Sequence, residues 1–358
     1  AKDHVYTGAE CELAFNEIDE IMAADYPETK QKQDETKDLI IKFSLFLEGR
    51  KISRELSSQR SELRQSFQKS RSAKDGPTKF MKALAGITRY RSDYWVPSNN
   101  GRINGFHPLQ EEANQVKLLS AFISAMKTSL TLPILSRYWL SGKESGDFSA
   151  YIEVLKAVSA FLAIRRAATG GTDGIDTCFR DIMEVGAPSK KFGLCAGPTH
   201  ENSILETRVL KQALRRKLSS SKVKFTSKEE WIDHVVDVPI YTQGKPLARF
   251  LLFSATHHTA LFPLKRGLLT RDSISPSDDR SYLSVNQWAS ERYQTVEHVA
   301  PNADKPEGWD KKIYANSRLK NTLGNLVLLP TAENASIGNS AWAKKKIFFT
   351  ALTAQRIG

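Results

Sequence analysis

Four polar residues near the C-terminus carry groups that could take part in hydrolysis. Glu297 and His298 are adjacent, Asn325 opens the run NLVLLP, and Asn334 follows that run. An imidazole has a reference pKa of about 6.5, so it can act as a base at neutral pH. Carboxylate and amide oxygens are hard ligands that suit Mg²⁺ or Mn²⁺. The four residues therefore have the chemical means for metal-assisted hydrolysis, provided that the fold brings them together.

Each of these residues also has an ordinary structural explanation. A Glu-His pair arises by chance in a chain of this length. Asn325 follows Gly324 and is equally typical of a turn at a strand edge. Asn334 is equally typical of a simple helix N-cap. Only the combination of the four favours a functional site.

The segments that hold these residues are predicted to form a strand, a long loop, a strand and a helix. YQTVEHV is short and β-prone, and NLVLLP is a compact apolar run between Gly324 and Pro330. TAENASIGNSAWAKKKIFFTAL (331–352) then predicts one closing helix, with capping residues at its start.

The alternation of side chains along a strand places a condition on this arrangement. On a regular strand Glu297 and His298 point to opposite faces of the sheet. Both can face one ion only if the strand ends or bulges there, and Pro301 favours an ending.

The rest of the chain is predicted to be helical, and the fold class is therefore mostly α. Apolar residues recur at helical spacing from 8 to 24 and from 29 to 72, with a break near Gly49. Further helices are predicted at 77–95, 108–126, 131–142, 149–168, 201–217 and 227–262, the last interrupted at Pro239 and Gly244.

The pattern changes near residue 269. LTRDSISPSDDRS is polar, contains a proline and has no periodicity, which is typical of a linker. We therefore divide the chain into a helical domain, residues 1–268, and a C-terminal domain, residues 269–358.

Composition limits the class of protein. The formal net charge of +12 favours a polyanionic partner such as nucleic acid, although a solvated basic surface explains it equally well. No apolar run is long enough to predict a membrane span. The three cysteines lie far apart, so we expect a reducing cytoplasm rather than a disulfide framework.

The order of motifs resembles that of HNH nucleases, in which a ββα-metal hairpin carries the catalytic residues. A narrower resemblance is to the C-terminal nuclease domain of GmrSD-type modification-dependent restriction enzymes and SspE-type phage-defence nucleases. It is carried by three segments, EHVAP, LGNLVLLPTAEN and AWAKKKIFF. FLAIRRAATGG and FTSKEEWIDHVVD are similar to the helical middle of that family. The resemblance implies a multi-helix platform followed by a small HNH-like hairpin.

The resemblance also implies a role for each residue. His298 is expected to be the general base, and Asn325 to tie the second strand to the loop that holds the His and to orient its ring. Glu297 and Asn334 are expected to be the ligands of Mg²⁺ or Mn²⁺. Two protein ligands leave room for water and for phosphate oxygens of the substrate.

Three consecutive lysines on the predicted closing helix are candidates for DNA contact. They are Lys344, Lys345 and Lys346. Because they span about 200° of a helix, not all three can face a duplex. A solvated helix face is the alternative explanation.

The resemblance predicts a metal-dependent DNA endonuclease that is the C-terminal effector of a bacterial restriction or anti-phage defence protein. The chain begins AKDHVYTGAE, and we find no GxxxxGK[ST] loop or DGQQR-like sequence in it. We therefore expect nucleotide handling and the sensing of modified DNA to lie in an N-terminal domain or a partner. A catalytically degenerate DNA-binding or regulatory module is the alternative, and action on RNA remains open.

Overall fold

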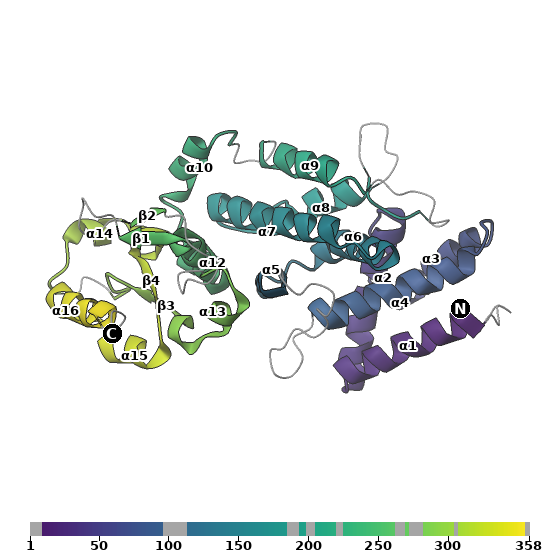
Figure 1. Ribbon diagram of the computed structural model, residues 1–358, viewed down its shortest axis with the longest axis horizontal. Coiled ribbons are helices and arrows are strands. Elements are labelled where there is room, and N and C mark those ends of the chain that lie inside the picture. The colour runs from purple at the N-terminus through teal and green to yellow at the C-terminus, as the bar shows by residue number, and fades with distance from the viewer. Residues whose placement is uncertain are drawn as a thin grey trace. The chain divides into compact units, whose positions relative to one another are not determined.

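Most of the described structure is helical. A computed structural model of the chain describes residues 9–95, 113–184, 193–197, 205–219, 225–261, 269–271, 282–303 and 307–354 (Figure 1). Its strands form two antiparallel sheets of two strands each, β1 with β2 and β3 with β4. No helix in these ranges is both long and apolar enough to cross a membrane. The mostly helical class predicted from the sequence is confirmed.

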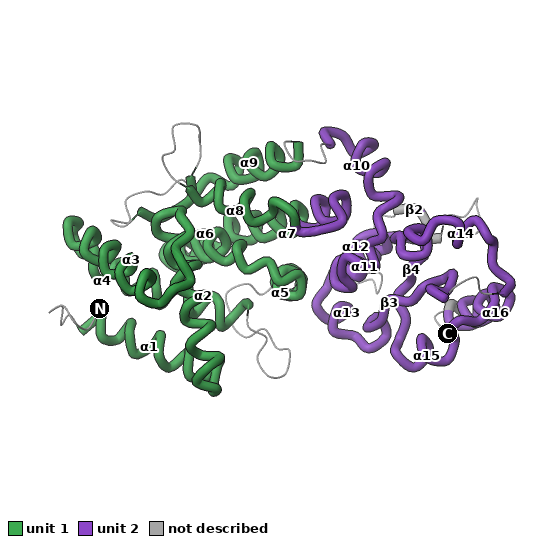
Figure 2. Tube along the Cα trace, turned by 180° about the vertical axis from the view of Figure 1, so that it is seen from behind, with its two compact units in different colours: residues 1–161, 173–221 green, residues 162–172, 222–358 purple. Residues whose placement is uncertain are grey.

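The chain divides into two compact units (Figure 2). One comprises residues 1–161 and 173–221, and the other residues 162–172 and 222–358. Residues 222–268 are therefore assigned to the same unit as the C-terminal strands, and one helix of this stretch, Lys245–Thr256, packs against both β3 and β4. This spatial division differs from the sequence boundary after residue 268, which remains a prediction about function.

The described part of the first unit is built mainly of α-helices. They are α1 (Ala9–Asp25), α2 (Thr29–Glu48), α3 (Leu56–Ser70), α4 (Gly76–Tyr94), α5 (Ala113–Ala125), α6 (Leu132–Ser145), most of α7 (Ser149–Thr169), α8 (Ile175–Met183) and α9 (Thr207–Ser219). The predicted helical residues 108–112 and 201–204 lie outside the described ranges.

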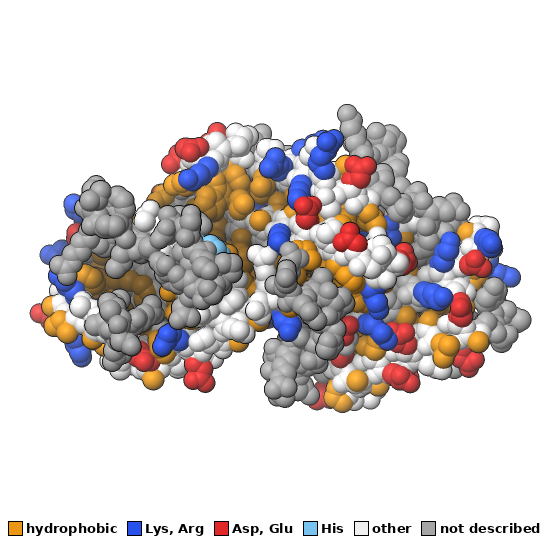
Figure 3. Space-filling model, in the orientation of Figure 1, with side chains coloured by type: hydrophobic (Ala, Val, Ile, Leu, Met, Phe, Trp, Pro, Cys, Tyr) orange, Lys and Arg blue, Asp and Glu red, His pale blue; other side chains and the backbone are white. Residues whose placement is uncertain are grey.

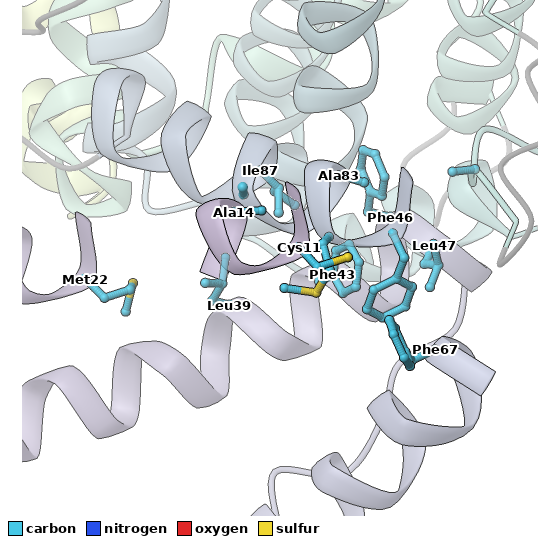
Figure 4. Close-up of a cluster of buried hydrophobic side chains, with 14 of the residues drawn as sticks. Cys11, Ala14, Met22, Leu39, Phe43, Phe46, Leu47, Phe67, Ala83 and Ile87 are labelled. Atoms are coloured by element: carbon cyan, nitrogen blue, oxygen red, sulfur yellow. The ribbon is translucent and has the colours of Figure 1, made fainter. Parts of the chain in front are cut away.

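The first unit has a core where α1, α2, α3 and α4 meet (Figure 4). On α2, the buried residues Leu39, Phe43, Phe46 and Leu47 recur at the spacing of one helix face. The ring of Phe43 meets Phe80 of α4 edge to face, with centroids 5.0 Å apart. Full burial of such a side chain contributes about 2 to 3 kcal/mol. The residues of this core all belong to the first unit.

The end of α2 depends on Gly49, where the sequence predicts a break. Gly49 has φ of 71°, and its N–H donates to Leu45 O at 3.0 Å. A Cβ placed there would lie 2.6 Å from both Glu184 Cα and Met183 O. Glycine is therefore required twice, by the left-handed backbone and by the close approach of a second chain segment.

The second unit combines short helices with the strands. Its elements are α10 (Lys228–Val235), α11 (Ile240–Gln243), α12 (Lys245–Thr256), β1 (Thr259–Leu261), β2 (Leu269–Arg271), α13 (Val285–Ala289), β3 (Thr295–His298), α14 (Lys311–Ala315), β4 (Leu326–Leu329), α15 (Thr331–Ile337) and α16 (Trp342–Ala354). The interruptions predicted at Pro239 and Gly244 separate α10, α11 and α12. The helix predicted to reach residue 262 ends at Thr256, and the predicted linker residues 272–281 lie outside the described ranges.

The two strands predicted around the candidate residues pair in antiparallel fashion. Thr295 lies opposite Leu329, and His298 lies opposite Leu326. Figure 1 shows β3 and β4 as neighbouring arrows, with the yellow helices α15 and α16 following them. The prediction of one closing helix is wrong, because the helix stops at Gly338, whose φ is 42°. Asn334 and the three lysines therefore lie on different helices.

We expect Gly49→Ala to lower the free energy of unfolding by more than about 2 kcal/mol, because a left-handed residue with a Cβ already costs about 1 to 2 kcal/mol and a backbone overlap is added. Gly146→Ala is the matched control, since Gly146 ends α6 with φ of 76° and nothing lies within 4 Å of the position that a Cβ would take there. Urea unfolding followed by far-UV circular dichroism measures both. Equal losses in the two variants would contradict the close packing at Gly49.

Candidate functional site

The ladder of β3 and β4 decides where Glu297 and His298 point. The pairing is regular through both residues, and it continues with Val299 N–H donating to Asn325 O at 2.8 Å. Exposure alternates along β3, with Glu297 half-buried and His298 buried. The two side chains therefore lie on opposite faces of the sheet. The strand neither bulges nor ends early enough to turn both toward one ion.

The His298 ring is held on its own face by two neighbours. Its Nε2 lies 3.0 Å from Asn321 Oδ1, and the ring meets Tyr241 of α11 at a centroid distance of 4.3 Å. An amide oxygen only accepts hydrogen bonds, so Nε2 carries the proton and the lone pair is on Nδ1. Burial lowers the pKa of His298, against the opposing effects of Asn321 and the Glu297 charge. The ring is therefore neutral at pH 7.

Asn321 is a site residue that the sequence interpretation missed. It ends the 3₁₀ turn Leu319–Asn321 and is buried. Its amide oxygen contacts the imidazole directly, whereas the resemblance implied that Asn325 orients the ring. The only signal in the sequence is an asparagine in the polar stretch RLKNTLGN, and that stretch has no periodicity from which a buried side chain could be inferred.

Asn325 braces the chain immediately after His298. Its Oδ1 accepts from Ala300 N–H at 2.7 Å, and its Nδ2 donates to Ala300 O at 2.8 Å and to Lys320 O at 2.7 Å. These bonds tie the start of β4 to the loop after β3, as the resemblance implied. Through Lys320 they also hold the turn that carries Asn321. Asn325 thus acts on the ring through the backbone and not by direct contact.

Glu297 is paired with a buried cation. Its Oε1 lies 3.0 Å from Nζ of Lys345 on α16, and the same Nζ donates to the main-chain oxygen of His298 at 2.7 Å. The Lys345 side chain is 0% exposed. The expectation that Lys345 contacts DNA is corrected by this burial, since its ammonium is directed into the protein. Lys344 and Lys346 are exposed on the same helix.

Asn334 lies in the first turn of α15, a helix that packs against β3. Its backbone N–H donates to Pro330 O at 3.0 Å. The N-cap position belongs to Pro330, so the capping explanation for Asn334 does not hold. The Asn334 side chain is half-buried and makes no hydrogen bond to any residue in the described ranges. Its amide oxygen is therefore available as a ligand.

The donors near β3 fit a hard divalent cation in their chemistry. Glu297 keeps Oε2, which has no hydrogen bond to a described residue, and Asn334 adds an amide oxygen. Among the described residues, no group of three or more His, Cys, Asp or Glu side chains could hold a metal ion. An ion here would rely on water or substrate oxygens for the rest of its ligands, as Mg²⁺ commonly does.

The C-terminal part of the chain matches a known family. Residues 252–356 match the family model described as GmrSD restriction endonucleases, C-terminal domain. The match extends from α12 to α16, and it contains all the candidate residues named above except Tyr241. It confirms the resemblance seen in the sequence for this segment. No curated protein matches the chain.

We expect Asn325→Ala to lower the free energy of unfolding by about 3 kcal/mol, because three hydrogen bonds are lost and their main-chain partners are left without replacements. Asn316→Ala is the control, since exposed Asn316 accepts a single bond from Arg318 N–H and its loss costs less than about 1 kcal/mol. Urea titration of both variants gives the comparison. A change at Asn325 no larger than that at Asn316 would show that the brace does not stabilise the fold.

Proposed function

We propose, from the match of residues 252–356 to the GmrSD restriction endonuclease C-terminal domain, that this chain is a metal-dependent DNA endonuclease of HNH type. The observation that carries the proposal is the oriented imidazole of His298, on β3 of an antiparallel pair that α15 follows. Phosphodiester hydrolysis needs a base for the attacking water and positive charge near the scissile phosphate. The described residues supply candidates for both.

His298 is the general base in this proposal. Because Nε2–H is bonded to Asn321, Nδ1 is the atom that takes the proton from the attacking water. Burial keeps the pKa of His298 below its ordinary value, so the ring is in its accepting form at neutral pH. The Asn321 hydrogen bond and the Glu297 charge favour the protonated ring, and they stabilise it once the proton has moved.

Glu297 and Asn334 would hold the metal ion, as Mg²⁺ or Mn²⁺. A bound ion would offset the negative charge that develops on the phosphate and on the leaving oxygen. The chain itself contributes one carboxylate oxygen that is not bonded to Lys345, and one amide oxygen on the first turn of α15. Both oxygens come from elements that pack together.

Lys344 and Lys346 are the proposed DNA contacts. Both are exposed near the start of α16, in the same segment as the candidate site. On the face seen in Figure 3, the described basic and acidic side chains are interspersed. No single basic patch is therefore seen among the described side chains of that face, and the proposed DNA contacts are individual lysines.

A second candidate function is a DNA-binding or regulatory module with a degenerate hydrolytic site. Two observations favour it: His298 is only 6% exposed, and Glu297 is already paired with Lys345. In either case, the recognition of a DNA modification and any control by nucleotides would belong to a further domain or a partner protein.

We expect the protein to nick or cut supercoiled plasmid DNA with Mg²⁺ or Mn²⁺, and to leave it intact in excess EDTA. His298→Ala should slow cleavage by about 100- to 10,000-fold, because this is what general base catalysis contributes. Folding and DNA affinity should stay near those of the parent. Gel electrophoresis of the plasmid under single-turnover conditions measures the rate, and an RNA substrate run in parallel identifies the preferred nucleic acid.

The matched control is His234→Ala, a histidine exposed on α10 that has no part in the proposed site. It should cleave like the parent. Undiminished cleavage in EDTA would refute the metal dependence. A parent protein that binds DNA but never cleaves it would favour the regulatory module.

We expect Lys344→Gln/Lys346→Gln to weaken DNA binding at every sequence, and to lower the slope of log K against log salt by about one unit for each lost phosphate contact. The measurement is a salt titration of DNA binding in EDTA, so that cleavage does not interfere. Lys30→Gln/Lys51→Gln, which removes two exposed lysines of the first unit, controls for the change in net charge. Equal slopes for parent and Lys344→Gln/Lys346→Gln would show that these lysines are only a solvated face.

A further inference from the structure

Lys345 is the one residue of the lysine triplet that faces the protein interior. Its side chain is 0% exposed, and its Nζ donates to both Glu297 Oε1 and the His298 main-chain oxygen. Lysine is almost never fully buried unless it is paired, because removing an ammonium from water is costly. A buried lysine with two specific acceptors in a proposed active site therefore calls for an explanation beyond surface charge.

The start of α16 is fixed before Lys345 reaches the strand. Trp309 packs on Trp342 with centroids 5.6 Å apart, and its indole Nε1–H donates to Ser340 O at 3.2 Å. The N–H groups of Lys344 and Lys345 both donate to Ala341 O at 3.1 Å. The helix thus begins at a defined place, which sets the position from which the Lys345 side chain reaches β3.

The position of Lys345 affects what Glu297 can do. One of the two carboxylate oxygens is occupied by the ammonium, and the carboxylate charge is largely neutralised within 3.0 Å. A divalent ion bound to the other oxygen would also lie near this positive charge, which opposes its binding. Holding Glu297 in place and weakening its attraction for cations are therefore two effects of one contact.

We propose that Lys345 is a positioning residue that acts as the built-in counter-ion of Glu297, fixing the carboxylate and lowering the affinity of the DNA-free protein for a divalent cation. The inference rests on the proposed function, because it concerns the carboxylate assigned to the metal. Its consequence is that the ion binds tightly only when DNA supplies phosphate oxygens. Free protein then carries little metal, and the site is completed on the substrate.

A double-mutant cycle of the parent, Lys345→Met, Glu297→Gln and the double variant tests the ion pair without any activity measurement. Lys345→Met should lower the urea midpoint strongly, since it leaves the Glu297 carboxylate without its cation. Lys345→Met/Glu297→Gln should be more stable than Lys345→Met alone, because the second change removes that uncompensated charge. Lys311→Met, at an exposed lysine of α14, should leave the midpoint unchanged.

The cycle is decisive even where a variant does not fold. If Lys345→Met is unfolded and the double variant is folded, charge compensation is supported. If both are unfolded, or if the two effects simply add, the proposal is overturned, because Lys345 then serves only the general fold.

Mn²⁺ binding to the DNA-free protein provides the second readout. Electron paramagnetic resonance of free Mn²⁺ should show roughly tenfold or more tighter binding by folded Lys345→Met than by the parent. Lys345→Arg, which keeps the positive charge, should bind as weakly as the parent. If the parent binds Mn²⁺ measurably and Lys345→Met binds it equally or more weakly, the role of Lys345 is overturned, whereas the proposed metal role of Glu297 is not. No binding by either protein, with no metal-dependent cleavage by the parent, would overturn it together with the proposed metal role of Glu297.

Discussion

The two-residue alternation of the β3–β4 ladder is the constraint on which the candidate site depends. It sends Glu297 to one face and His298 to the other, so each side chain has its own set of neighbours. Each face must then be completed by other segments. The turn that ends at Asn321 and the helix α11 complete the His298 face, whereas α16 supplies the partner of Glu297. The loop between the strands and the helices after them are needed because two strands alone cannot build the site.

The polar groups around β3 and β4 form hydrogen bonds with residues that are distant in the sequence. The Asn325 side chain forms hydrogen bonds with the backbone of two segments, the loop after β3 at Ala300 and the turn before β4 at Lys320. Lys345 bonds to a side chain and to a main-chain oxygen of adjacent strand residues. Buried groups of this kind are costly unless they are paired, so each bond also excludes alternative arrangements of the segments. The imidazole is held by the side chains of Asn321 and Tyr241, and the bonds of Asn325 fix the backbone next to Asn321.

The sequence predicts the elements of the structure better than the contacts between side chains. Periodicity locates the helices of the first unit, glycine predicts the end of α2, and the apolar run at 325–330 predicts β4. The sequence does not predict that Asn321 orients His298, because an asparagine in an aperiodic turn gives no local signal. The break at Gly338 does have a signal in the sequence, the turn-forming run Gly338-Asn339-Ser340, which the prediction of one closing helix overlooked. That break separates Asn334 from the lysines and alters which residues can act together.

Helix α16 shows how one short segment serves both the interior and the surface. Consecutive helical residues are rotated by about 100°, so a lysine directed at β3 must have its two neighbours turned away from it. Lys345 consequently compensates Glu297, while Lys344 and Lys346 stay in solvent. Any movement of α16 caused by a polyanion at the outer lysines would act on the inner one, because all three share one rigid turn. The two exposed charges and the buried charge that pairs with the carboxylate are thus placed by the same helix.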